Sequence, residues 1–94
     1  MVTEIATITI AAGREGEFDA AMQGGGLDAL RACAGVQSVR FGRGVESPDT
    51  FAFVVEWDSL EAHETARADE AFTRFRAAFG TCATGGAMAH YTLA

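Results

Sequence analysis

The chain of 94 residues is predicted to be a single α+β domain with the ferredoxin-like order β-α-β-β-α-β, in which two helices cover one face of an antiparallel sheet. Short runs of β-branched and aromatic residues alternate with longer stretches whose apolar residues recur at helical spacing. The second and third short runs are separated by only a few residues, which implies an antiparallel hairpin. A chain of this length has no room for a second domain, so residues 1–94 form one unit.

The first half of the chain predicts a strand, a helical region and a second strand. Residues 2–10 alternate as a strand does, and Gly13 ends this run. Residues 14–34 are predicted to be helical, with an apolar stripe formed by Phe18, Met22, Ala29 and Cys33. Residues 36–43 then form the second strand.

Three consecutive glycines, Gly24, Gly25 and Gly26, interrupt the first helical region. Each glycine inside a helix costs about 1 kcal/mol relative to alanine, so the run predicts a break or a kink. The segment is either the flexible wall of a cavity or an irregular turn between two short helices, and we favour the turn.

The second half begins with the run from Phe51 to Val55, which follows Pro48-Asp49 and ends at Trp57. Asp58 or Ser59 then starts the second helical region, since a carboxylate followed by an acidic residue three places later is a helix-start signal. This region carries a strong apolar stripe and a second capping residue, Asp69, and a short strand over residues 87–93 closes the chain. The stripe consists of Ala71, Phe72, Phe75, Ala78 and Phe79.

The second face of the predicted sheet is not polar. On the third strand, Phe51, Phe53, Val55 and Trp57 point one way, and Ala52 and Val54 point the other way. A sheet that is covered by helices on one side only should show a polar second face. We therefore expect a second copy of the chain to cover this face in a homodimer.

Composition and charge exclude several classes of function. Thirteen acidic residues face seven arginines and no lysine, which gives a net charge of −6 and argues against binding to nucleic acid or to an anionic membrane. No segment resembles a signal peptide or a membrane span, so a cytoplasmic location is expected. Cys33 and Cys82 are interpreted as small buried hydrophobic residues that stay reduced.

The third strand and the helix after it carry a resemblance to a known family. The pattern Pro48-Asp49-x-Phe51-x-Phe53-Val54-Val55-Glu56-Trp57-x-Ser59-x-Glu61-Ala62-His63, followed by Phe72-x-x-Phe75, resembles the antibiotic biosynthesis monooxygenase family. This resemblance implies a dimeric α+β barrel. Members of the family include cofactor-free oxygenases of phenolic polyketides, haem-degrading enzymes and small-molecule isomerases.

The chain departs from the haem-degrading members of that family at three positions. Arg76 stands near their iron-ligating histidine, Ala6 near their strand asparagine and Ala66 near their helix tryptophan. Ala66 also replaces a second histidine that many relatives carry three residues after the position of His63. We therefore expect neither haem degradation nor a paired-histidine site.

The resemblance makes His63 the candidate base, or the hydrogen-bond partner of a substrate anion, because imidazole titrates near neutral pH. The alternative is a packing role, since His63 follows Leu60 by three residues and should share its side of the helix. Trp57 is assigned as a stacking wall and donor to an oxyanion. Substrate contacts are assigned to Phe72, Phe18, Met22 and Arg40, although a solvated Arg40, able to pair with Glu56, is the alternative.

No metal or cofactor is expected. His63 and His90 are too far apart in the sequence to match a ligand spacing, and the glycine run does not follow a strand as a phosphate loop would. His90 is expected to be either buried in the dimer or exposed. The predicted function is a cofactor-independent monooxygenase for a small aromatic or phenolic molecule, such as an anthrone or a quinol. The alternatives are a non-catalytic binding or structural dimer, and a small-molecule isomerase.

Overall fold

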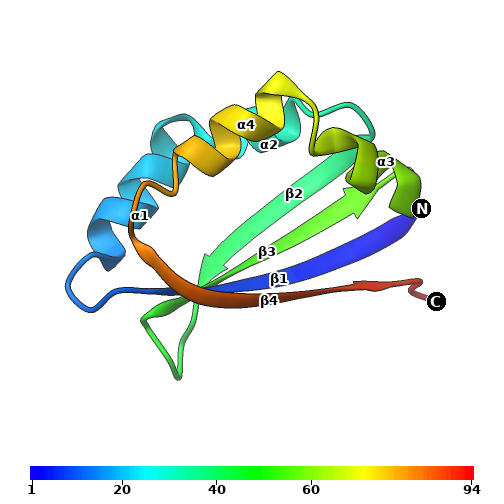
Figure 1. The fold of residues 1–94 in the computed structure, drawn as a ribbon. Helices are drawn as coiled ribbons and strands as arrows, with labels where there is room; N and C mark the ends of the chain where they lie inside the picture. Colours follow the sequence, from blue (N-terminus) through cyan, green and yellow to red (C-terminus); the bar gives the residue numbers. More distant parts are fainter.

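The computed structural model describes residues 1–94 and confirms the ferredoxin-like α+β fold (Figure 1). One sheet of four antiparallel strands has the order β2-β3-β1-β4. The helices lie on one face of this sheet, as Figure 1 shows. In chain order the elements are β1 (Val2–Ile10), α1 (Glu15–Ala21), the π-helical segment η1 (Met22–Gly26), α2 (Leu27–Arg31), β2 (Val36–Arg43), β3 (Thr50–Trp57), α3 (Leu60–Ala66), α4 (Glu70–Ala77) and β4 (Ala83–Tyr91).

The register of the central strand β1 decides which residues meet at the candidate site. Glu4 of β1 lies opposite Val55 of β3 on one side and opposite His90 of β4 on the other. Trp57, the last residue of β3, lies opposite Val2. Because residues that are directly opposite point to the same face of a sheet, the side chains of Glu4, Val55 and His90 all face the helices.

The core is aromatic and is organised around β3. Phe51, Phe53, Val55 and Trp57 alternate along this strand and are each at most 2% exposed. Phe18 of α1 packs on this row, with its ring centroid 5.0 Å from that of Phe51. Fully burying a side chain of this size stabilises the fold by about 1.5–3 kcal/mol.

The predicted interruption at the glycine run is confirmed. Residues Met22–Gly26 form a π-helical segment with non-helical backbone at Gly25, so an irregular connection joins two short helices, α1 and α2, as favoured. Gly25 has φ of 148°, a conformation that is strained for any residue with a Cβ atom. The segment is therefore a kink between α1 and α2.

The second helical region is divided into α3 and α4 by two capping residues. The Ser59 hydroxyl accepts a hydrogen bond from the Ala62 amide at 3.0 Å and begins α3. The Asp69 carboxylate accepts a hydrogen bond from the Ala71 amide at 2.8 Å and begins α4, as predicted. Of the two predicted start residues, Ser59 is the cap, while the Asp58 carboxylate accepts a hydrogen bond from the Gln37 side chain.

The face of the sheet opposite the helices is partly apolar and uncovered in the single chain. Ile5 is 38% exposed and Tyr91 is 47% exposed on this face. Arg40 is exposed, as in the solvated alternative. Its optional pair with Glu56 does not form, because the Glu56 carboxylate accepts a hydrogen bond from the Thr3 hydroxyl at 2.9 Å and Arg40 lies opposite Val54.

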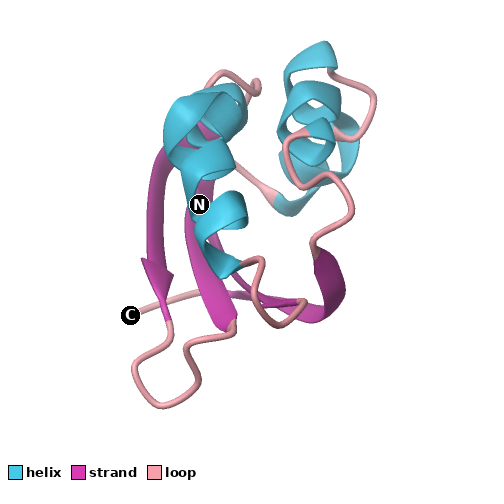
Figure 2. Cartoon of the chain, turned by 90° about the vertical axis from the view of Figure 1, so that its left-hand side faces the viewer, coloured by secondary structure: helices cyan, strands magenta, loops and turns pink.

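β4 begins at Ala83, four residues before the predicted start of that strand. The turn between β2 and β3, over residues 44–49, projects from one end of the sheet in both views (Figures 1 and 2). None of the helices combines the length and the apolar composition needed to cross a membrane.

Candidate functional site

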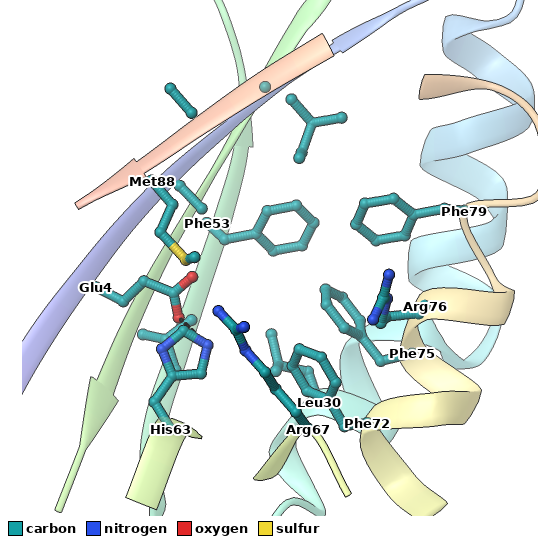
Figure 3. Close-up of a pocket in the computed structure, with 15 residues that line it drawn as sticks. Glu4, Leu30, Phe53, His63, Arg67, Phe72, Phe75, Arg76, Phe79 and Met88 are labelled. Atoms are coloured by element: carbon teal, nitrogen blue, oxygen red, sulfur yellow. Dashed lines mark ion pairs between the residues drawn. The ribbon is translucent and has the colours of Figure 1, made fainter. Parts of the chain in front are cut away.

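A cavity of about 460 Å³ lies between the sheet and the helices (Figure 3). Its walls come from β1, β3, β4, α2, α3, α4 and the residues that follow α3 and α4. Four phenylalanines give it an aromatic lining, namely Phe53, Phe72, Phe75 and Phe79, and four polar residues also reach it, namely Glu4, His63, Arg67 and Arg76. This volume and this balance of apolar and polar lining are typical of small-molecule sites.

Glu4 is the acidic group of the site and is only 7% exposed. Its carboxylate oxygen Oε1 accepts a hydrogen bond of 2.8 Å from the indole Nε1–H of Trp57. Trp57 is fully buried and does not contribute to the wall of the cavity. The indole therefore holds the carboxylate in place from behind, and its only N–H group is already used. The assignment of Trp57 as a stacking wall and oxyanion donor is corrected accordingly.

His63, on α3, joins this acidic group to the edge strand β4. Its imidazole ring stacks on Trp57, with ring centroids 4.5 Å apart and planes 13° apart. The Nδ1 atom of His63 lies 2.6 Å from Nε2 of His90, so these two nitrogens share one hydrogen bond. The Nε2 atom lies 3.6 Å from Oε1 of Glu4, at ion-pair distance rather than in a hydrogen bond. Each nitrogen of His63 thus faces a specific partner.

Burial determines the charge of this imidazole. Desolvation lowers the pKa of His63 below its ordinary value of 6.5, the Glu4 carboxylate opposes this shift, and His90 and Arg67 add to it. His63 is therefore neutral at neutral pH and retains one nitrogen lone pair, which is the form that a general base requires.

Two arginines bring positive charge to the cavity. Arg67 follows α3 and Arg76 lies on α4, and both line the cavity. Figure 3 shows the side chain of Arg67 extending from the end of its helix toward the cavity. Neither guanidinium forms an ion pair. The ion pairs made by arginines in the structure involve Arg14 and Arg31 instead. Both cations are therefore available to a bound anion.

The structure places the residues assigned from the sequence in three different environments. His63 and Phe72 line the cavity. Phe18 and Met22 are fully buried in the core and are not part of its wall, so their assignment to substrate contact is corrected. Arg40 is also corrected, because it is exposed on the face of the sheet that points away from the helices.

Two residues of the site were missed by sequence reasoning. His90 contacts His63, so the expectation that the site contains no paired histidines is wrong. Glu4 has a weak sequence signal, since it is an acid on the same side of the alternating strand as the apolar Ala6 and Ile8. The expectation that His63 and Leu60 share an environment is also wrong, because Leu60 is 42% exposed while His63 is 4% exposed.

The sequence separation of His63 and His90 argues against a cluster of metal ligands, and the structure contradicts that argument. Glu4, His63 and His90 each place a potential ligand atom within 4.8 Å of the other two. Residues that are distant in the sequence meet here because the pairing of β1 with β4 sets Glu4 opposite His90, while the ring of His63 on α3 contacts that of His90. Of the positions that depart from the haem-degrading pattern, Ala6 and Arg76 line the cavity and Ala66 is buried.

An antiparallel sheet with helices on one face, enclosing an aromatic cavity that a carboxylate and an imidazole line at one end, defines a small α+β protein with a candidate small-molecule site. The chain matches the family described as antibiotic biosynthesis monooxygenase over residues 1–78, and it belongs to this family. No curated protein matches the chain.

Solved structures of similar proteins have the same fold. A candidate antibiotic biosynthesis monooxygenase from Bordetella bronchiseptica is 25% identical, with a TM-score of 0.89 over 99% of this chain and 96% of that chain. A protein from Pseudomonas aeruginosa is 24% identical, with a TM-score of 0.78 over 99% and 94% of the two chains. A candidate member from Deinococcus radiodurans is 19% identical, with a TM-score of 0.77 over 100% and 93%.

Proposed function

We propose that the protein is a cofactor-independent monooxygenase that acts on a small, flat aromatic molecule with an acidic proton, such as an anthrone or a quinol. The observation that carries this proposal is a neutral, buried imidazole at the polar end of an aromatic cavity, with a partner at each of its nitrogens. The family supports an oxygenase by its description.

The cavity suits a flat aromatic substrate. Phe53 and Phe72 on opposing walls offer ring faces and edges against which an aromatic ring packs favourably. Arg67 and Arg76 would attract the negative charge that develops when the substrate loses its proton, because no acidic side chain neutralises either of them. Their charge should stabilise the anion more than the neutral substrate, which favours ionisation.

Proton transfer begins the proposed reaction. His63 accepts the substrate proton at Nε2 while its Nδ1–H donates to His90. The resulting imidazolium lies 3.6 Å from the Glu4 carboxylate, whose charge stabilises it. Trp57 acts as a positioning residue, because it fixes the carboxylate by a hydrogen bond and the imidazole by stacking.

Oxygen then reacts with the substrate anion. The anion passes one electron to O₂, and the resulting radical pair combines to form a carbon–oxygen bond. The peroxide takes up a proton and loses water, so that an anthrone and O₂ give an anthraquinone and one H₂O. The substrate supplies the electrons, and the protein binds it, deprotonates it and excludes bulk water.

The proposal includes a homodimer in which two sheets pack face to face. Its motivation is the uncovered outer face of the sheet, on which Ile5, Val54 and Tyr91 are at least partly exposed. A symmetric pair is the commonest arrangement that covers such a face. Light scattering at micromolar concentration should give twice the chain mass of 9.9 kDa, and a stable monomer would overturn this part of the proposal.

A small-molecule isomerase is the second candidate. The separation of 3.6 Å between His63 and Glu4 also suits an enzyme that removes a proton at one carbon and returns it at another. Oxygen consumption separates the two candidates, because isomerisation uses none.

The decisive experiment is oxygen uptake with an anthrone, without added cofactor. We expect turnover above the rate in buffer, and a decrease of about 10²–10⁴-fold in kcat for His63→Ala, the usual contribution of a general base. Glu64→Gln is the matched control, since Glu64 is exposed beside His63 on the same helix. Wild-type rates no faster than buffer, over a panel of phenolic and anthrone substrates, would remove the oxygenase proposal.

A further inference from the structure

Three side chains from separate elements meet beside the cavity, and two of them, Glu4 and His63, line it. They are Glu4 of β1, His63 of α3 and His90 of β4, and one potential ligand atom of each lies within 4.8 Å of those of the other two. We propose that this cluster binds a divalent transition-metal ion, with Zn²⁺ as the reference ion, through two imidazole nitrogens and one carboxylate oxygen. This inference goes beyond the proposed oxygenase and does not depend on it.

The donor set matches the chemistry of such ions. Neutral imidazole and carboxylate groups are the usual ligands of Zn²⁺, and they also suit Fe²⁺, Ni²⁺ and Mn²⁺. An imidazole binds a metal only through an unprotonated nitrogen. Nδ1 of His63 and Nε2 of His90 share one hydrogen bond, so one of these two facing nitrogens already offers a lone pair.

The distances require only a small adjustment. In a tetrahedral zinc site with bonds of about 2.05 Å, two ligand atoms are about 3.3 Å apart. Nδ1 of His63 and Nε2 of His90 are 2.6 Å apart and already point toward each other. If an ion replaced the shared proton, the distance between the two nitrogens would need to increase by less than about 1 Å. The Glu4 carboxylate would approach the ion by rotation of its side chain. The movement is small, because its ligand atom already lies within 4.8 Å of those of both histidines.

The surroundings of Glu4 support a bound cation. This carboxylate is 7% exposed, and the only basic side chain within ion-pair distance is His63. The hydrogen bond from Trp57 is the one direct contact that its Oε1 makes with a donor. A buried carboxylate that lacks a cationic partner is costly, and a metal ion would supply the missing positive charge.

Trp57 would serve as an outer support of the site. Its indole N–H orients the Glu4 carboxylate, and its ring face fixes the plane of the His63 imidazole. Supports of this kind are characteristic of metal centres in proteins, where they hold the ligands in the binding orientation.

Three protein ligands leave one position of a tetrahedral ion open. Glu4 and His63 line the cavity, so this open position would face the cavity and be able to take water or an anionic ligand. Sites with three protein ligands and an open position are of the catalytic type, whereas structural zinc sites use four protein ligands. The ion would occupy the imidazole lone pairs, so the metal-bound form and the form that acts as a base in the proposed oxygenase exclude each other.

The test is a Zn²⁺ titration by calorimetry on protein without a histidine tag, after dialysis against a chelator. We expect one ion per chain and a midpoint of thermal unfolding that rises with Zn²⁺ concentration. Co²⁺ should give visible absorption bands without the near-ultraviolet bands of thiolate ligation, because Cys33 and Cys82 lie outside the cluster.

Variants decide which residues bind the ion. His90→Ala and Glu4→Gln should each weaken binding by at least about tenfold, while the exposed control Glu64→Gln should leave it unchanged. His90 lies on an exposed strand, so His90→Ala decides the question if Glu4→Gln does not fold. Absence of saturable binding, equal affinity in His90→Ala, or thiolate bands with Co²⁺ would overturn the proposal. The titration contains no substrate and measures no turnover, so failure here leaves the proposed oxygenase untouched.

Discussion

β3 and β4 lie on opposite sides of β1 and both contribute to the wall of the cavity, yet they are buried to very different extents. Alternate residues of β3, from Phe51 to Trp57, are at most 2% exposed, whereas Met88 of β4 is 47% exposed. No residue of β4 is fully buried, and His90 is the one that is half-buried. One wall is therefore held in place by packed side chains and the other by backbone hydrogen bonds.

The positions of the two strands in the sheet explain the difference. β3 is an inner strand between β2 and β1, beneath the phenylalanines of α1 and α4, whereas β4 is an edge strand. β4 is fixed by its ladder to β1 over Ala83–Tyr91 and by the bond of 2.8 Å from the Ala11 amide to the Cys82 carbonyl just before it. The comparison shows that the two walls of the cavity are positioned differently. The packing of buried side chains positions β3, whereas the register of the backbone pairing with β1 positions β4.

The largest expected effect is on the free energy of unfolding when a side chain of each wall is truncated to alanine. Phe53→Ala removes a ring that is 2% exposed and should lower the free energy of unfolding by about 3–5 kcal/mol. Met88→Ala, the matched change on β4, should lower it by less than about 1 kcal/mol, because nearly half of Met88 is already in solvent.

Chemical denaturation followed by the fluorescence of Trp57, the single tryptophan, measures both changes. Comparable losses for the two variants would break the comparison and would show that β4 is packed against something absent from the single chain. A second subunit would be the first candidate for that contact.

Much of the fold was predictable because local signals agree with the tertiary structure. The alternation of residues 2–10 and the run from Phe51 to Trp57 give strands in the structure, and Asp69 caps α4 as expected. The start of β4 was not predictable in this way. Residues 83–86 contain two glycines and no large apolar side chain, so the pattern carries no strand signal, and pairing with β1 determines the strand.

A smaller effect should come from the two adjacent glycines of β4. A Cβ atom at Gly86 would lie 2.7 Å from the carbonyl oxygen of Thr7 on β1, and a backbone atom cannot move aside cheaply. Gly86→Ala should therefore cost about 1–3 kcal/mol and displace β4. At Gly85 nothing lies within 4 Å of the added Cβ, so Gly85→Ala should change the free energy of unfolding by less than about 0.5 kcal/mol.

Denaturation curves of the two glycine variants test the role of register in β4. If Gly86→Ala is as stable as Gly85→Ala, the ladder between β1 and β4 is looser than the structure indicates. Slowed substrate turnover in Gly86→Ala, with Gly85→Ala unaffected, would further support the placement of β4 beside the cavity.

The smallest expected effect concerns His63, which connects the buried Trp57 to His90 on the exposed strand. Its pKa is lower in the folded chain than the ordinary value of 6.5, so the unfolded chain binds more protons between these two pKa values. Stability should thus be full above pH 6.5 and should fall as the pH drops below it, by at most about 1.4 kcal/mol per pH unit for this one group.

The pH dependence is measured as the free energy of unfolding of wild type and His63→Gln over the same pH range. The variant should lose the contribution of this group, so the difference between the two curves isolates it from the carboxylates, which titrate at lower pH. We expect the stability of wild type, relative to that of the variant, to fall toward acidic pH. If it rises instead, His63 is protonated in the folded chain and the expectation is wrong.

The candidate site was less predictable than the fold for a specific reason. His63 and Phe72 could be identified because they follow a recognisable strand and helix. Glu4 and His90 could not, because their meeting depends on the antiparallel register of two strands at opposite ends of the chain. A shift of one residue in that register would move His90 to the other face of the sheet, and no local pattern fixes it.

The exposed strand β4 has a consequence for the evolutionary history of such a chain. Ala87 and Met88 shape the cavity but contribute little to the core, so mutations there should be tolerated by the fold more often than mutations on β3. Selection can therefore alter the shape of the cavity along one strand while the aromatic core is conserved. A lineage with this division of roles can acquire a new ligand in a few mutational steps without passing through unstable ancestors.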